Sequence, residues 1–192
     1  MENTRRDFLK HGLQLAAALA LYKPIESIAS VNNGVIKKYI SKNIKIYTEP
    51  LYFKHIRTGE TFKINHVYGN LEPEALKDLQ YFLRDYRTGT LHEMDPGLLD
   101  IIHVVKKKSH SNHTIEVISG YRTPETNALL KLHNSRVAEH SLHIQGMAID
   151  VRFPDVRSNR IRDLALSMKS GGVGYYGKYN FIHLDTGRVR TW

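Results

Sequence analysis

The chain has 192 residues and a formal net charge of +9 at pH 7, with 41% apolar and 24% charged residues. This length suits one domain with its own core, and the composition excludes a disordered or repetitive chain. The sequence contains no cysteine, so disulfides and thiolate metal sites are excluded, and any metal must be held by His, Asp or Glu. The positive charge favours an anionic partner: nucleic acid, a phospholipid surface or the carboxylate-rich cell wall.

Residues 1–29 have the pattern of an export signal. The basic stretch Thr4–Lys10, which contains two adjacent arginines, precedes the apolar run Leu13–Leu21. That order is typical of a signal peptide, and the run is too short to span a membrane comfortably. The paired arginines resemble a twin-arginine signal, whereas an amphipathic helix of the domain would show a charged face. We therefore expect a mature domain of residues 30–192 in the periplasm, touching the membrane only if the signal stays uncleaved, and no nucleic-acid partner.

The first part of the mature chain is predicted as strands followed by two helices. Runs of β-branched, aromatic or alternating residues predict strands at Ile44–Tyr47, Leu51–Ile56 and Phe62–Tyr68, which form an N-terminal hairpin. Helices should start near Pro73 and at Pro96, because apolar residues recur after each proline at three- and four-residue steps. The lysine run at the end of the second helix suits the negative end of a helix dipole and needs no binding role.

The second part of the chain mixes strands and helices without strict alternation. Strand patterns cover Thr114–Ser119, Met147–Phe153, Val173–Tyr176 and Phe181–Asp185. One helix should start at Pro124, and another should be capped by Ser158 and end before a pair of glycines. Mixed elements of this kind predict a single α+β domain, built on an antiparallel sheet with flanking helices.

The strand around Asp150 carries the first chemical signal. Alternate residues of a strand share a face, so Asp150 lies opposite the apolar core residues Ile149 and Val151 and on the same face as the small Ala148. His143 stands seven residues upstream in a turn that can fold its imidazole back over this face. The pattern therefore brings a carboxylate and an imidazole to one polar face of the sheet.

His183 and Asp185 stand two residues apart on the last predicted strand and also share a face. Two histidines and one aspartate with an open fourth position are typical of a catalytic zinc site, since structural sites are closed by four protein ligands. A zinc-bound water still needs a group that takes its proton. Asp185 is our first candidate for this base, and its alternative role is to accept a hydrogen bond from a ligand histidine. The remaining histidines that lack ligand spacing are interpreted as surface or structural: His55, His66, His92, His103, His110 and His113.

Four ordered motifs extend this pattern: Ser119–Pro124, Ser141–Asp150, Gly171–Tyr176 and Phe181–Gly187. Together they resemble the M15-type zinc peptidases of peptidoglycan, also called the LAS or D,D-peptidase metallo-fold, and within them the murein endopeptidase K-like branch. The resemblance covers about residue 45 to the end of the chain.

The resemblance implies that His143, Asp150 and His183 bind zinc. It also implies that Arg122 binds substrate and stabilises the oxyanion, although a loop-bracing ion pair is the alternative for this residue, and that Ser141 lies at the substrate-binding edge. Several members of the family end in His-x-His or Glu-x-x-His, whereas this chain has His-x-Asp, so the base stays open. Tyrosines that can line the groove or simply be half-buried are Tyr121, Tyr175, Tyr176 and Tyr179.

The activity implied by the resemblance is a monomeric zinc endopeptidase that hydrolyses cross-links between the stem peptides of peptidoglycan. A D,D-carboxypeptidase or dipeptidase of the same fold is the alternative enzyme. A non-catalytic cell-wall-binding module is the alternative from another class, and the presence of all three ligands, Arg122 and Asp185 argues against it. The Gly171–Gly174 run does not predict phosphate binding, because it follows a helix and lacks a Gly-Lys-Ser/Thr ending.

Overall fold

The computed structural model describes residues 49–65, 71–134 and 137–192. The predicted signal (1–29) and the predicted strand Ile44–Tyr47 lie outside the described residues, as does His66. Among the helices of the described part, none has the length and apolar character needed to cross a membrane.

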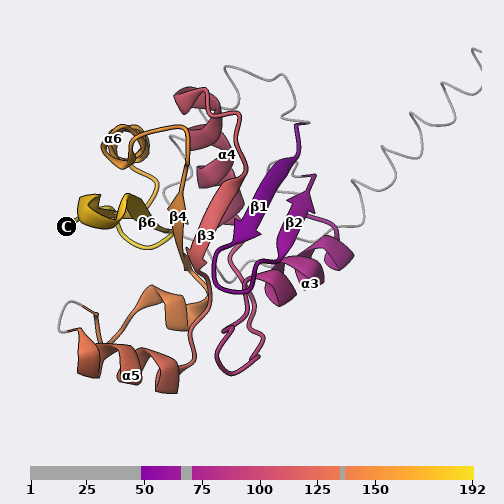
Figure 1. Ribbon diagram of the computed structural model, residues 1–192, viewed down its shortest axis with the longest axis vertical. Coiled ribbons are helices and arrows are strands. Elements are labelled where there is room, and N and C mark those ends of the chain that lie inside the picture. The colour runs from indigo at the N-terminus through magenta and orange to yellow at the C-terminus, as the bar shows by residue number, and fades with distance from the viewer. Residues whose placement is uncertain (1–48, 66–70, 135–136) are drawn as a thin grey trace, which may run out of the picture.

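The described residues form one seven-stranded sheet in the order β2-β1-β3-β4-β6-β5-β7 (Figure 1). Its strands are β1 (Leu51–His55), β2 (Thr61–Ile64), β3 (Ile115–Ser119), β4 (Ala148–Arg152), β5 (Gly172–Tyr176), β6 (Phe181–Asp185) and β7 (Arg190–Thr191). The expectation of a purely antiparallel sheet is wrong, because β1 pairs with β3 and β5 with β7 in parallel. Side chains alternate with a period of two in parallel and antiparallel strands alike, so the alternation of apolar residues could not distinguish the two kinds of pairing. The long connection from β1 to β3 permits these two strands to pair in parallel.

The helices of the described residues are α3 (Pro73–Phe82), α4 (Gly97–Ser109), α5 (Pro124–His133) and α6 (Ser158–Met168). Proline occupies the first turn of α3 and α5, where no intrahelical N–H is needed, and the Thr123 hydroxyl caps α5 by accepting a hydrogen bond from the Thr126 N–H at 3.1 Å. Pro96 precedes α4 as its N-cap. Ser158 is the first residue of α6 rather than its cap, and Arg157 stands at the N-cap without a side-chain bond.

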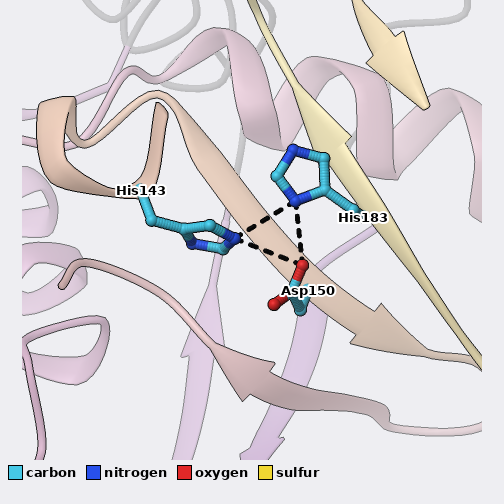
Figure 2. A group of neighbouring side chains, drawn as sticks. All are labelled: His143, Asp150 and His183. Carbon is cyan, nitrogen blue, oxygen red and sulfur yellow. Dashed lines mark hydrogen bonds and ion pairs between the residues drawn. The ribbon is translucent and has the colours of Figure 1, made fainter. Parts of the chain in front are cut away.

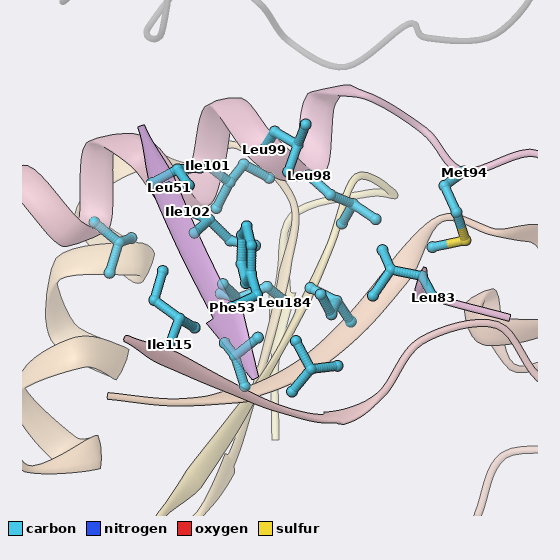
Figure 3. Close-up of a cluster of buried hydrophobic side chains, with 14 of the residues drawn as sticks. Leu51, Phe53, Leu83, Met94, Leu98, Leu99, Ile101, Ile102, Ile115 and Leu184 are labelled. Carbon is cyan, nitrogen blue, oxygen red and sulfur yellow. The ribbon is translucent and has the colours of Figure 1, made fainter. Parts of the chain in front are cut away.

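The apolar core lies between the sheet and the helices α3, α4 and α6. Leu98 and Ile102 of α4 pack in this core with Phe53 of β1 and Leu184 of β6 (Figure 3). α6 packs against β5 and β6 at the same side. Ile149 and Val151 of β4 point into this core, as the alternation of a strand predicts. The alternate residues of β4, which include Asp150, therefore point to the opposite side of the sheet.

The opposite side of the sheet faces α5 and the short 3-10 helix η1 (Leu142–Gln145). In Figure 1, α5 lies away from α4 and α6. Its last residues and η1 border an open groove whose floor contains Asp150 of β4 and His183 of β6. The fold therefore separates an apolar face of the sheet, covered by helices, from a polar face that borders a groove.

Candidate metal centre

Three side chains converge on the groove floor from three elements (Figure 2). Asp150 and His183 are directly opposite each other in the antiparallel ladder of β4 and β6. His143 comes from η1, whose N-cap residue Ser141 accepts a hydrogen bond from the His143 N–H at its hydroxyl, at 3.4 Å. η1 ends at Gly146 in the left-handed conformation (φ 67°), and a Cβ there would collide with the Glu93 carbonyl oxygen. Gly146 therefore permits the tight turn that places His143 over the sheet.

The three converging atoms are close enough to share one metal ion. His143 Nε2 lies 3.2 Å from Asp150 Oδ1 and 3.1 Å from His183 Nδ1, and the latter two atoms are 2.9 Å apart. Tetrahedral ligands at zinc distances are separated by about 3.3 Å, so the observed spacing fits such an ion with a slight expansion. Among the described residues, this is the one group of three His, Asp or Glu side chains whose donor atoms come so close.

The hydrogen bonds behind both histidines fix which nitrogen faces the centre. His143 Nδ1 lies 2.7 Å from the Gly120 carbonyl oxygen, and His183 Nε2 lies 3.0 Å from Asp185 Oδ2. Both partners only accept hydrogen bonds, so we assign the ring protons to these nitrogens. In the neutral imidazoles, the other nitrogens then direct lone pairs at Asp150 Oδ1. Three electron pairs facing one point repel one another unless a cation lies between them, which is the arrangement of a metal site.

Electrostatics favour a neutral His143 and an ionised Asp150, whereas they favour positive charge on His183. Burial lowers the pKa of His143 to about 4, so this imidazole is neutral at pH 7. For Asp150, burial acts to raise the pKa, but His143, His183 and Arg122 outweigh it and hold the pKa well below the usual range. Burial also opposes charge on His183, yet hydrogen bonds to Asp150 and Asp185 raise its pKa. The centre thus combines an ionised carboxylate with surroundings that stabilise added positive charge.

Asp185 is fully buried beside His183, where it receives four hydrogen bonds and forms an ion pair with Arg190. Its Oδ1 accepts from the N–H groups of Gly172 and Gly187, at 3.0 and 2.9 Å, and from Arg190 Nη1 at 3.0 Å. Its Oδ2 accepts from His183 Nε2 and forms an ion pair with Arg190 Nη2 at 2.8 Å. Burial raises the pKa of Asp185, but these hydrogen bonds outweigh it and bring the pKa to about 2. Asp185 does not line the groove, and its Oδ2 contacts the ring nitrogen of His183 that does not face Asp150.

Arg122 borders the groove and touches the centre through Asp150. Its Nη2 donates to Asp150 Oδ2 at 2.6 Å, and its Nε donates to Ser119 Oγ at 2.8 Å. Ser119 pairs with Asp150 across β3 and β4, so the guanidinium is held along one row of the sheet. The structure thus contains the ion pair considered as an alternative role, and it also places Arg122 beside the metal-binding atoms.

The groove has a volume of about 420 Å³ and extends from the β1–β2 turn to the end of the chain. Ser141, Tyr176 and Tyr179 line it, as does Arg122. Other predicted tyrosines lie elsewhere: Tyr121 is buried and stacks on His92, with ring centroids 4.6 Å apart, and Tyr175 lies under the Arg162 guanidinium.

Sequence reasoning missed further residues that line the groove, among them Arg57, Arg87 and Trp192. None of these three stands in a motif or at ligand spacing, so no signal in the sequence identified them. The Trp192 ring lies 5.1 Å from the His183 ring and against Gly174, where a Cβ would collide with the indole. Gly172 likewise leaves room for the Asp185 carboxylate. These glycines of the Gly-Gly-Val-Gly run therefore make space for the chain's own side chains.

Comparison with known proteins agrees with this site. The family described as peptidoglycan L,D-endopeptidase MepK matches residues 45–192. A protein of Haemophilus influenzae named probable peptidoglycan L,D-endopeptidase MepK is 42% identical over 167 residues, 86% of this chain and 88% of that protein. The peptidoglycan L,D-endopeptidases MepK of Escherichia coli and Shigella flexneri are 38% identical over 143 residues, 74% of this chain and 79% of each relative. A search of solved structures finds no match. The resemblance predicted from the motifs is confirmed, and the chain belongs to the peptidoglycan L,D-endopeptidase MepK family of M15-type peptidases.

Proposed function

We propose that this protein is a zinc-dependent endopeptidase that hydrolyses peptide cross-links of peptidoglycan, and that His143, Asp150 and His183 hold its zinc. The observation that carries the proposal is the convergence of two imidazole lone pairs and one carboxylate oxygen in an open groove. Family membership supports the substrate class, because the matched relatives are named peptidoglycan L,D-endopeptidases.

A bound zinc ion would supply Lewis acidity and a water of lowered pKa. The protein's own groups prepare the site for this chemistry. The Gly120 carbonyl and the Asp185 carboxylate hold the two imidazoles in the tautomers that leave a nitrogen lone pair toward the groove. Asp185 is therefore proposed as a positioning residue rather than as the base, since both its oxygens are occupied by donors and it is shut off from the groove.

Arg122 is proposed to bind the substrate and to stabilise the oxyanion. Two of its N–H groups are engaged by Ser119 and Asp150, which fixes the plane of the guanidinium. Its remaining N–H groups form no hydrogen bond with the described residues. They border the groove, where they can donate to a carbonyl or carboxylate oxygen. Ser141 is proposed to lie at the substrate-binding edge, because its side chain lines the same groove beside His143.

The direct test is digestion of defined peptidoglycan fragments by the zinc-loaded protein. An endopeptidase converts cross-linked muropeptide dimers to monomers, whereas a D,D-carboxypeptidase or dipeptidase trims the monomers themselves. Chelation should abolish hydrolysis, and zinc should restore it. The variant His143→Ala should neither bind zinc nor cleave, so full activity of this variant would refute the proposed site. Metal analysis of the folded protein separates the enzyme from a wall-binding module that holds no metal.

We also propose that residues 1–29 are a twin-arginine-type export signal and that the enzyme acts in the periplasm. The basic and apolar order of this segment supports export, and a substrate in the cell wall requires it. Fractionation of cells that express the full chain, with mass determination of the mature N-terminus, tests this. Replacement of both arginines by lysine should leave the precursor in the cytoplasm.

A further inference from the structure

Four arginines line the groove, and they differ in whether an acidic side chain neutralises them: Arg57, Arg87, Arg122 and Arg190. Arg122 is paired with Asp150 and Arg190 with Asp185. Among the described residues, neither Arg57 nor Arg87 forms an ion pair with a carboxylate, and both are exposed. Asp150 is the one side-chain carboxylate among the described residues that line the groove. The end of the groove at Arg57 and Arg87 is therefore positively charged, and no acidic side chain of the described residues pairs with these two arginines.

Arg57 projects from a structured turn rather than from a loose loop. The β1–β2 turn is closed by hydrogen bonds between His55 and Gly59 (2.8 Å) and between His55 and Glu60 (2.8 Å). The buried His55 ring accepts the Arg57 N–H at its Nδ1, at 3.2 Å. The same ring packs edge-on against Tyr86, with centroids 5.5 Å apart, and so joins the turn to the segment that carries Arg87.

Arg87 is held in a second turn that is tied to the metal centre. Its N–H donates to Asp85 Oδ1 at 3.0 Å, and its guanidinium lies 4.3 Å from the Tyr86 ring centroid. The other oxygen of the buried Asp85 accepts from the Thr123 N–H at 2.9 Å, next to Arg122. One carboxylate thus fixes the Arg87 turn relative to the arginine beside the metal-binding atoms. The two turns that carry Arg57 and Arg87 are therefore fixed on a common frame with the reactive end of the groove.

We propose that Arg57 and Arg87 form a carboxylate-binding subsite, which holds a free carboxylate of the stem peptide while the scissile bond lies at the metal centre. The inference rests on the proposed function, because it takes peptidoglycan peptides as the substrate. A planar guanidinium binds a carboxylate through two parallel N–H bonds, and an exposed arginine that no acidic side chain of the described residues neutralises can bind one without first breaking an ion pair. The subsite would select cross-links flanked by an ionised carboxylate and reject amidated ones.

The test compares two substrates and three proteins, all loaded with zinc. The substrates are a cross-linked muropeptide dimer with free carboxylates and the same dimer with these carboxylates amidated. The proteins are the native enzyme, the double variant Arg57→Gln/Arg87→Gln, and the control Arg160→Gln, which removes an exposed charge of α6 outside the groove. On the free dimer, the double variant should raise KM roughly tenfold with kcat unchanged, since each exposed pair contributes little and the two act together. On the amidated dimer, native enzyme and double variant should have the same, raised KM.

Other outcomes overturn the inference. An equal loss on both dimers would show that the arginines do not recognise these carboxylates. An equal loss in Arg160→Gln would show that only the overall charge matters, and a fall in kcat alone would indicate a structural effect. Failure of the native enzyme to cleave either dimer would instead refute the proposed function, so the two failures are distinguishable.

Discussion

The variant Asp185→Asn separates the two roles of this residue and changes no volume. Five donors surround the native carboxylate, three at Oδ1 and two at Oδ2. Asparagine has one carbonyl oxygen, so in either orientation its NH₂ group faces at least two of these donors. Each buried unsatisfied donor costs about 1–3 kcal/mol, so two of them predict a loss of about 2–6 kcal/mol in the free energy of unfolding of the metal-free protein. Loss of the anchor for the His183 ring should also lower zinc affinity by roughly 10- to 100-fold.

The two quantities require two assays: urea unfolding in the presence of a chelator, and zinc titration in competition with a chromogenic chelator. At saturating zinc, activity should recover to within about tenfold of the native value, because a positioning residue acts mainly through metal occupancy. The control is Asp163→Asn, an exposed carboxylate paired with Arg162, which should change stability by less than about 0.5 kcal/mol. If Asp185→Asn keeps native zinc affinity but loses about 1000-fold in kcat at saturating zinc, Asp185 is the base and our reasoning is wrong.

Three further changes probe the frame of the site. Burial raises the pKa of Asp85, but hydrogen bonds from Thr126, Thr123 and Arg87 outweigh it and lower the pKa, so the ionised carboxylate stabilises the fold above pH about 4 and this stabilisation is lost as the pH falls. In Asp85→Asn, the free energy of unfolding measured with urea should therefore decrease less between neutral and acidic pH than in the native protein. An unchanged decrease would contradict this. Gly146→Ala should displace η1 and weaken zinc binding by more than about tenfold in titration, whereas native affinity would show that the turn relaxes freely. Ile102→Ala should cost about 2–5 kcal/mol in urea unfolding, with the zinc affinity of the folded protein unchanged.

Strand parity predicted most of what defines the metal centre. Asp150 stands opposite Ile149 and Val151 in the alternation, and a sheet with one apolar core face leaves the other face to the carboxylate. The alternation needs no knowledge of neighbouring strands, so it holds whether the ladder is parallel or antiparallel. It could not predict that β4 lies between β3 and β6, which brings Asp150 directly opposite both Ser119 and His183. Strand order depends on how the helices cross over the sheet, and the local pattern carries no such information.

Residues of the groove that lie far from any motif could not be found from the sequence. Arg57 stands in a hairpin turn and Arg87 in a loop between helices, where an arginine is usually a solvated surface charge. They gain a candidate role only because the buried His55 and Asp85 fix both turns beside the same groove. The interpretation of His55 as structural rather than ligating agrees with this position in the turn, at 1% exposure.

The role of Asp185 shows why spacing alone cannot distinguish a base from an orienting group. Both roles require a carboxylate near a ligand histidine, and a His-x-Asp pair on one strand satisfies both. What separates them is the number of donors around the carboxylate, because a base needs a free lone pair and access to water. Those donors come from Gly172 on the neighbouring strand and from Arg190 after the following turn, and the absence of a side chain at Gly172 is what lets Asp185 fit there. The chemistry assigned to Asp185 is therefore set by residues that only the folded chain brings to it.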